Sequence, residues 1–393
     1  MKIEPRTLKG FRDFLPKEAK KREYVISILK KVFESYGFEP LETPTLEYEE
    51  ILTGKYGEEG DKLMYRFTDN GDRKVAMRYD QTVPLARVIA QYQNGLPMPF
   101  KRYQIQNVWR AENTQKGRYR EFLQCDIDTV GSPSLLADAE IIGCAFECIK
   151  KIGFKNVKVL VNDRSTFKDL QPQFVSAIDK LEKIGKEEVV KELVQKGMPQ
   201  ENAEKLINSF NDTKPVPNVI SLFANLKKLG LEENKDFVFK PGLARGLDYY
   251  TSTIFEIVVE GYDAGSVAGG GRYGNLIGMF AGKDIPAVGI SFGFDRLIEA
   301  MEELKLFPEN LETTKVLLTN SEKALGIADK LRTENINTEV YLDEKDLEKQ
   351  LKYADKKQIP FVLIIDGNDL ILKDMQKRTQ SILTLEEIIK RLK

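Results

Sequence analysis

The sequence predicts an α+β fold in which an antiparallel sheet carries the site, a helical insertion interrupts the sheet domain, and a smaller α/β domain follows. Three observations support this. Residues 103–130 have the pattern of two strands joined by a long charged turn, residues 167–232 have helical periodicity, and short apolar strands alternate with helices after residue 308. We therefore expect a main domain in two parts, 1–166 and 233–308, an insertion at 167–232 and a separate domain at 313–393.

The composition is that of an ordinary globular protein. The 393 residues are 41% hydrophobic and 31% charged, which allows two or three domains with their own cores. Lys plus Arg number 60 against 61 Asp plus Glu, so any surface that binds nucleic acid must be local. No signal-peptide run and no stretch long enough to span a bilayer is present, so we expect a cytoplasmic protein without a membrane partner.

Histidine is absent and cysteine is scarce. A chain without histidine cannot use Ser-His-Asp or Cys-His catalysis, His-ligated zinc or imidazole acid–base chemistry. Of the three cysteines, Cys144 and Cys148 are one helical turn apart and are expected as small core residues, and neither a disulfide framework nor a thiolate metal site is expected. Any catalysis must therefore rely on arginines, carboxylates, backbone groups and hard metal ions.

The segment 103–130 has one packing face and one polar face. If 118–130 is extended, alternation groups Phe122, Gln124, Asp126 and Asp128 on one face and Leu123, Cys125 and Ile127 on the other. The preceding strand groups Gln104, Gln106 and Arg110 by the same parity, and the turn region holds Glu112, Lys116, Arg118 and Arg120. Such a hairpin could hold an anionic and a cationic group together, although an amphipathic surface hairpin with solvated charges has the same pattern.

Short elements precede this hairpin. Residues 17–36 have the apolar spacing of a core-facing helix that ends at Gly37, and 37–46 contains short extended pieces. Two short strands flank a turn at 69–72, and a helix begins near Pro84. Asp80 and Thr82 stand just before that helix, where polar side chains commonly face a site, but capping of the helix explains them about as well.

Helical periodicity dominates the middle of the chain. Residues 135–153 predict a helix and 157–161 a strand. Four apolar stripes follow, which include Ile178, Leu193, Ile207 and Phe223 in turn. This series predicts the helical insertion.

A glycine-rich run then follows a strongly β-forming stretch. Residues 267–274, VAGGGRYG, match the dinucleotide pattern G-x-G-x-x-G at Gly269, Gly271 and Gly274. We reject a dinucleotide site because only about ten residues separate this run from the next strand, too few for a crossover helix. The glycines instead predict close approach of backbone to a ligand, with ordinary turn geometry as the alternative.

Residues 286–304 predict a short strand that runs into a helix, with Arg296 in the first helical turn. A helix amino terminus attracts anions, so an arginine there predicts a phosphate site. Pairing of Arg296 with Glu299 or Glu303 is the alternative.

The last domain is expected to contain strands at 315–319, 338–342 and 361–366 that alternate with helices. A helix at 345–357 carries a lysine stripe of Lys345, Lys349, Lys352 and Lys356, which Lys373, Lys377 and Arg378 extend. A lysine stripe is usually a solvated face, and phosphate-backbone binding is the other interpretation.

Together these stretches resemble the class II aminoacyl-tRNA synthetases, and within them the histidyl-tRNA synthetase family, over nearly the whole chain. Residues 37–46 look like motif 1, with Pro44 at a dimer interface, 103–130 like motif 2 and 286–304 like motif 3. RGLDYYTSTIFE at 245–256 resembles the histidine-specific signature, which is far more discriminating than the class II motifs. LKYADKKQIPFVLII at 351–365 resembles the anticodon-binding domain of the family.

The resemblance implies roles for single residues in ATP binding and catalysis. Arg110 would hold the α-phosphate of ATP, Arg118 would be another phosphate ligand and Arg296 would hold the γ-phosphate. Glu112 would face the adenine side and Phe122 would stack on adenine. Arg245 resembles the catalytic arginine of the family, and Arg110 would share that role.

The resemblance also implies a histidine site and tRNA contacts. Asp80, Thr82 and Gln124 would bind the α-amino group, and Asp128 with Tyr250 would bind the imidazole. Tyr249 and Tyr273 belong to the same expected site. The expected tRNA-binding residues are Gln115, Lys349, Lys352 and Lys356. The chain departs from the family pattern in three places. Asp80 and Asp128 are shorter than the glutamates common in one branch of the family, though they suit another branch, Gly274 stands where an aspartate is usual, and the last domain is shortened around 367–371.

These roles imply a ligase that activates L-histidine with ATP and Mg²⁺ and transfers it to tRNA(His) as a homodimer, with no side chain assigned to the metal. The alternative is the synthetase-like regulatory subunit of ATP phosphoribosyltransferase, a non-catalytic paralogue that typically loses parts of the arginine set and the anticodon domain. Because Arg110, Arg245 and Arg296 are present and an α/β domain follows, we favour the enzyme. A nucleic-acid-binding protein without catalysis would leave the cleft residues unexplained.

Overall fold

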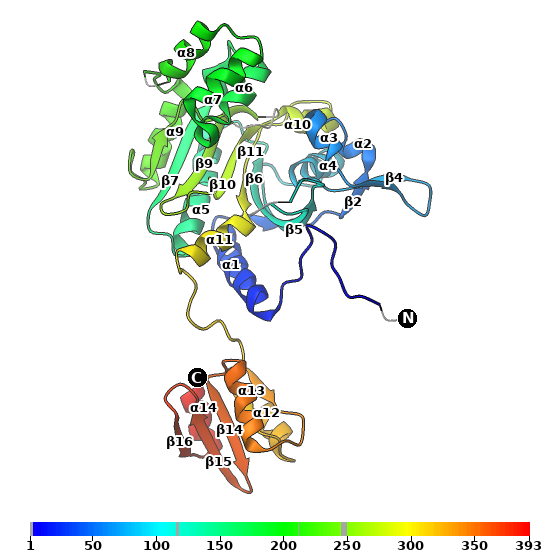
Figure 1. Cartoon of the computed structure of the whole chain (residues 1–393), viewed down its shortest axis with the longest axis vertical. Helices are drawn as coiled ribbons and strands as arrows, with labels where there is room; N and C mark the ends of the chain where they lie inside the picture. The colour runs from blue at the N-terminus through cyan, green and yellow to red at the C-terminus, as the bar shows by residue number, and fades with distance from the viewer. Residues whose placement is uncertain (1–2, 115–117, 211, 245–249) are drawn as a thin grey trace. The chain divides into compact units, whose positions relative to one another are not determined.

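The computed structural model of the chain describes residues 3–114, 118–210, 212–244 and 250–393 (Figure 1). By their contacts they divide into two compact units, one mainly Arg22–Phe307 and the other mainly Pro308–Lys393. Each unit combines a sheet with helices, which confirms the predicted α+β architecture. Over the described part of the chain, no helix is long and apolar enough to cross a membrane.

The main unit is built on a sheet whose eight strands, counted over the described residues, run in the order β1-β5-β6-β11-β10-β9-β7-β8. The strands from β5 to β7 in this order pair with one another in antiparallel fashion. At the two ends of the sheet, β1 is parallel to β5 and β8 is parallel to β7. The strands are β1 Glu39–Pro40, β5 Phe100–Trp109, β6 Glu121–Val130, β7 Val157–Asp163, β8 Phe237–Phe239, β9 Tyr250–Val259, β10 Ala268–Tyr273 and β11 Ala287–Gly293.

Strands β5 and β6 form the hairpin predicted at 103–130. Phe100 is paired with Val130 and Trp109 with Glu121, so the connection spans 110–120. Strand β6 begins at Glu121 and not at the predicted residue 118, because the Arg120 N–H bonds to the carbonyl oxygen of Gly10 at 2.9 Å instead of to a sheet partner. The predicted antiparallel hairpin with a long turn is otherwise confirmed.

Helices α1 Pro16–Ser35, α5 Leu135–Lys151, α9 Pro217–Lys228 and α11 Phe294–Glu303 contribute to the main core on one face of this sheet. The core includes Phe33 from α1, Ile141 from α5 and Phe294 from α11, packed against Cys125 and Ile127 of β6. All three cysteines are buried, which confirms the predicted core position of Cys144 and Cys148. The polar side of β6 faces away from this core.

A second core lies between helices α4 Thr82–Tyr92 and α10 Asn275–Ala281. Helix α2 Glu49–Leu52 adds Leu52 to this core, and α3 Gly57–Lys62 follows α2 in the sequence. A small sheet in the order β2-β4-β3 joins this core, made of β2 Leu46–Tyr48, β4 Lys74–Met77 and β3 Arg66–Thr68. The predicted turn at 69–72 joins β3 to β4. Helix α4 begins two residues before Pro84, which lies in its first turn as predicted.

The predicted insertion divides into two parts. The 3₁₀ turn Arg164–Phe167 and helices α6 Pro172–Ile178, α7 Leu181–Gln195 and α8 Gln200–Ser209 share a core that includes Ile178, Leu193 and Ile207 (green in Figure 1). Helix α9 instead packs on α5 and adds Phe223 to the main core. The fourth apolar stripe therefore belongs to the sheet domain, although its periodicity alone grouped it with the other three.

The carboxy-terminal unit has a sheet in the order β13-β12-β14-β15-β16. The predicted strands are β12 Val316–Leu318, β13 Thr338–Val340 and β14 Phe361–Asp366, and β12 is parallel to both others. Helices α12 Ala324–Thr333, α13 Leu347–Lys356 and α14 Leu385–Leu392 accompany them. Antiparallel strands β15 Asp369–Asp374 and β16 Thr379–Ile382 were not predicted, although the Gly367-Asn368 turn between β14 and β15 is a typical hairpin signal.

Candidate active site

A cavity of about 520 Å³ lies in the main unit and collects the predicted site residues. Every predicted ATP-binding or histidine-binding residue that the structure describes lines it, namely Asp80, Thr82, Arg110, Glu112, Arg118, Phe122, Gln124, Asp128, Tyr250, Tyr273 and Arg296. They come from β6, β9, β10, the start of α4, the connection after β5 and the start of α11. The sheet thus joins segments that are far apart in the sequence.

Strand β6 forms the floor of the cavity. Its residues Phe122, Gln124, Asp126 and Asp128 line the cavity, while Cys125 and Ile127 are fully buried in the core beneath it. This is the alternation that the sequence predicted. Asp126 and Asp128 are each only 3% exposed, so the far end of the strand presents two carboxylates with little access to water.

Asp128 is held by two partners at the deep end. The Tyr273 hydroxyl donates to Asp128 Oδ1 at 2.5 Å, and Arg102 Nη2 lies 2.8 Å from Oδ2. Burial raises the pKa of Asp128, and the neighbouring Arg102 guanidinium opposes this shift. Arg102 is fully buried and was missed by the sequence reasoning; it is paired with Asp128 across the β5–β6 hairpin, so a register for the hairpin could have found it.

Asp80 both caps helix α4 and lines the cavity, the two roles between which the sequence could not decide. Its Oδ1 accepts hydrogen bonds from the Val83 N–H at 3.1 Å, which caps α4, and from the Tyr56 hydroxyl at 2.8 Å. It also lines the cavity. Burial raises the pKa of Asp80, opposed by these bonds and by Arg110 and Arg102.

The other end of the cavity carries arginines and an aromatic ring. The Arg110 guanidinium lies 5.1 Å from the centre of the Phe122 ring and 4.5 Å from that of Tyr79, and its Nε donates to the Tyr79 carbonyl oxygen at 3.1 Å. Arg118 Nε pairs with Glu112 Oε2 at 3.0 Å. In the first turn of α11, Arg296 Nη1 donates to the Ser266 carbonyl oxygen at 3.3 Å. This end can bind an anion beside a flat ring.

The glycine-rich run is strand β10 and not a turn. Gly269 lines the cavity. At Gly270 and Gly271, the neighbouring strands come too close to leave room for a side chain. A Cβ at Gly270 would lie 2.0 Å from the carbonyl oxygen of Gly289, and one at Gly271 would lie 2.6 Å from that of Thr253. Strand β10 is antiparallel to both β9 and β11, an arrangement without the parallel crossover that a dinucleotide fold needs.

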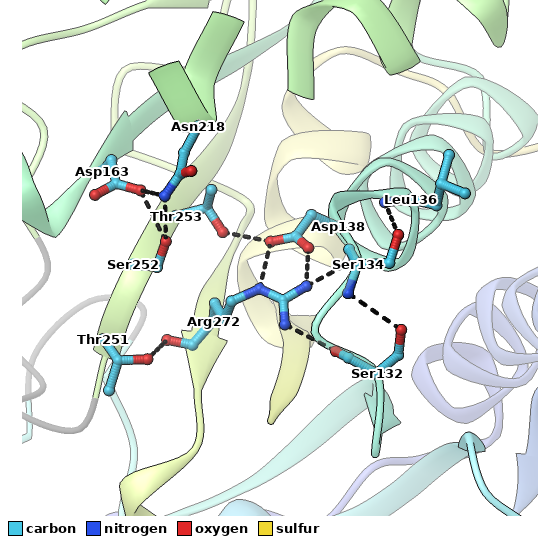
Figure 2. Close-up of polar contacts among 10 residues, drawn as sticks. All are labelled: Ser132, Ser134, Leu136, Asp138, Asp163, Asn218, Thr251, Ser252, Thr253 and Arg272. Atoms are coloured by element: carbon cyan, nitrogen blue, oxygen red, sulfur yellow. Dashed lines mark hydrogen bonds and ion pairs between the residues drawn. The ribbon is translucent and has the colours of Figure 1, made fainter. Parts of the chain in front are cut away.

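A buried ion pair anchors β10 beside the cavity (Figure 2). Arg272 Nη2 pairs with Asp138 on α5, and Arg272 also donates to the carbonyl oxygens of Ser132 and Ser134, each at 2.8 Å. The Thr253 hydroxyl on β9 donates to the same Asp138 carboxylate. Since neighbouring strand residues face opposite sides, this network holds the strand while Tyr273 faces Asp128.

Some predicted residues are not placed in the cavity. Arg245, Tyr249 and Gln115 lie outside the described residues. Lys349, Lys352 and Lys356 are exposed on α13 of the carboxy-terminal unit, where Lys349 pairs with Asp346 and Lys352 with Glu348. Their role in tRNA binding stays a prediction. The cavity also includes residues that the sequence reasoning gave no role, among them Tyr56, Tyr79, Tyr119, Asp126, Gly289 and Ser291.

Comparison with known proteins gives consistent matches along the chain. The family model described as Histidyl-tRNA synthetase matches residues 10–196 and 170–297, and the model described as Anticodon binding domain matches 311–393. A protein of Cytophaga hutchinsonii named Histidine--tRNA ligase is 38% identical, and the match covers 99% of each chain.

Solved structures agree. A crystal structure of histidyl-tRNA synthetase from Nostoc has 31% identity and a TM-score of 0.85, covering 99% of this chain and all of the other. A Bacillus halodurans structure titled as an ATP phosphoribosyltransferase regulatory subunit/histidyl-tRNA synthetase has a TM-score of 0.76, with 93% of this chain and all of the other covered, but at 21% identity it shows only the shared fold. The chain belongs to the histidyl-tRNA synthetase family.

Proposed function

We propose that the protein is a histidine–tRNA ligase, which activates L-histidine with ATP as histidyl-adenylate and transfers it to tRNA(His). The observation that carries this proposal is the cavity, where arginines suited to phosphate, an aromatic ring suited to a base and buried carboxylates suited to a cation line one space. Relatives of matching length that bear the name Histidine--tRNA ligase support it.

ATP is assigned to the arginine-rich end. Adenine stacks on Phe122 with Glu112 at its side, and Arg110, within 5.1 Å of that ring, holds the α-phosphate. Arg296 holds the γ-phosphate, supported by its place in the first turn of α11. Arg118 has a side chain that is 54% exposed, so it is free to turn from Glu112 to a phosphate.

Histidine is assigned to the carboxylate end. Its α-ammonium is bound by Asp80, Thr82 and Gln124, and its imidazole by Asp128 with Tyr250 of β9 and Tyr273 of β10. This places the amino-acid carboxylate toward Arg110. A carboxylate can accept a hydrogen bond from a ring N–H, and a tyrosine hydroxyl can also pair with the ring.

The chemistry needs positioning and charge stabilisation more than a side-chain base. A carboxylate oxygen of histidine attacks the α-phosphorus, the bond to the bridging oxygen breaks, and diphosphate leaves. Arg110, with Arg245 from outside the described residues, stabilises the charge on the α-phosphate oxygens. The terminal ribose hydroxyl of tRNA then attacks the carbonyl carbon of the adenylate, and AMP leaves.

Mg²⁺ belongs with the nucleotide in this proposal. Among the described residues, no group of three or more His, Cys, Asp or Glu side chains is arranged for a metal ion. Glu112 pairs with Arg118 and is assigned to the adenine side, so no side chain is assigned to the ion, and the nucleotide phosphates at the arginine-rich end would hold it. Bound there, the ion would neutralise phosphate charge. Binding of tRNA by Gln115, Lys349, Lys352 and Lys356, a homodimer and a cytoplasmic location complete the proposal.

Histidine-dependent exchange between ATP and diphosphate tests the activity directly. We expect exchange by the wild type, its loss in Arg110→Ala and Arg245→Ala, and its retention in Arg391→Ala, an exposed arginine on α14 that serves as a matched control. Charging of tRNA(His) tests the second step. Histidine binding without exchange or charging would overturn the ligase proposal and favour the regulatory subunit.

A further inference from the structure

Asp126 is a buried cavity residue without an assigned role. It lies on β6 between Gln124 and Asp128, lines the cavity and is 3% exposed. Ser291 on β11 is paired with Asp126 in the sheet, but Asp126 Oδ1 accepts no hydrogen bond from any residue that the structure describes. A buried carboxylate oxygen that lacks a donor costs free energy, which indicates that a ligand supplies the donor.

The charges around Asp126 are unbalanced. Arg102 from β5, Asp128 from β6 itself and Asp80 from the segment before α4 face it, so three carboxylates share one fully buried cation. Arg102 already pairs with Asp128 at 2.8 Å. Burial and the two like charges raise the pKa of Asp126 to about 7, although Arg102 opposes the shift. A second positive charge in the cavity would let Asp126 ionise.

The depth of Asp126 in the cavity indicates which part of the histidine substrate supplies that positive charge. Along β6, Gln124 is partly exposed, whereas Asp126 and Asp128 are equally buried. The α-ammonium must stay beside the reacting carboxylate, which has to reach the phosphate at Arg110. The side chain of the amino acid is therefore the group that reaches the depth of Asp126.

Building on the proposed function, we propose that Asp126 is a further substrate-binding residue and that it holds the bound histidine side chain as an imidazolium cation. Asp126 and the imidazole ring share one titratable proton in the complex, whichever of the two carries that proton before binding. If neutral histidine meets protonated Asp126, the O–H bond breaks and an N–H bond forms on the ring. If the imidazolium meets the carboxylate, no proton moves.

This pairing predicts how the KM for histidine depends on pH. With a ring pKa of about 6.5, the KM is lowest near pH 7 and rises about tenfold between pH 7 and pH 8.5, because the free partners have then lost the shared proton. Below pH 6 it rises again, because both free partners are protonated.

The test measures exchange by the full-length chain from pH 6 to pH 8.5, with histidine and with 1,2,4-triazole-3-alanine, whose ring has a similar shape but is a far weaker base. We expect the rise for histidine only. In Asp126→Asn, the KM for histidine at pH 7 should increase about 10- to 100-fold and lose its alkaline rise, while the KM for the analogue changes less than about threefold. The matched control is Asp72→Asn, the same change in the exposed β3–β4 turn, where a φ of 57° suits asparagine.

Each outcome decides the proposal. A flat wild-type profile for histidine overturns it even if Asp126→Asn does not fold, and so does an unchanged profile in the variant. An equal loss for both substrates would place Asp126 at the α-ammonium and overturn the imidazolium assignment. If the wild type shows no exchange, the ligase proposal fails separately, and calorimetric binding of histidine over the same pH range still tests Asp126.

Discussion

Replacing Gly289 by alanine should separate histidine binding from ATP binding. Gly289 on β11 is paired with Asp128 on β6. A Cβ at this position would lie 1.9 Å from Asp128 Oδ1 and 2.6 Å from Asp128 Cγ. Since the Asp128 carboxylate is the group that can move, it must rotate away, which breaks the bond from Tyr273 and disturbs the pair with Arg102.

The size of the change in histidine binding follows from the lost hydrogen bond between Tyr273 and Asp128. Loss of a hydrogen bond to a charged group costs about 1.5–3 kcal/mol, which corresponds to an increase of about 10- to 100-fold in the KM for histidine. The KM for ATP should stay within about twofold, because Arg110 and Phe122 lie at the other end of the cavity. Exchange kinetics with each substrate varied in turn measure both values.

The control is Gly326→Ala in α12, where a Cβ meets no atom within 4 Å and both KM values should be unchanged. A thermal unfolding curve establishes that each variant folds. If folded Gly289→Ala binds histidine with the wild-type KM, the position of the Asp128 carboxylate does not control histidine recognition, and the reasoning is refuted.

Three further predictions concern stability and ATP binding. Arg272→Met leaves the fully buried Asp138 carboxylate unpaired and should lower the free energy of unfolding in urea by about 3–5 kcal/mol; a loss below about 1 kcal/mol contradicts this. Phe122→Leu should raise the KM for ATP about tenfold through lost stacking, and an equal rise for histidine would argue against adenine there. Because the pKa of Asp126 is raised from 3.8 to about 7, its contribution to stability is present below pH 3.8 and lost as the pH rises through 7. Asp126→Asn should therefore raise the unfolding temperature of the free protein most at pH 8, and a gain that grows on acidification would contradict the shift.

The sequence predicted residues whose placement depends on local periodicity. Alternation along β6 was sufficient to group Phe122, Gln124 and Asp128, because a strand turns every second side chain to the same face. Gly289 could not be found in this way, and Arg102 could be linked to Asp128 only by the register of the hairpin. Each acquires its role from being paired with Asp128 on a neighbouring strand, and pairing between β6 and β11 joins residues more than a hundred positions apart.

Local periodicity was also insufficient to predict which elements of the fold pack together. Helical periodicity shows that a helix has a buried face but not which element covers that face, so α9 looked like a member of the insertion although it packs on α5. The alternation of strands and helices correctly predicted β12, β13 and β14. Strand β15 was missed because its charged residues, among them Lys373, favoured a solvated surface, and β16, with the short sequence TQSI, has little apolar alternation to mark it as a strand.

In the proposed assignment, the order of side chains along β6 matches the order of groups in histidyl-adenylate. The strand presents one side chain to the cavity every two residues, about 7 Å apart: Phe122 for adenine, Gln124 for the α-ammonium, then Asp126 and Asp128 for the imidazole. A slip of one residue would turn all four toward the core, so the chemistry depends on the register of the sheet. Glycines that admit no Cβ in β10 and β11, and the Arg272–Asp138 pair beneath them, therefore contribute to substrate recognition by fixing that register.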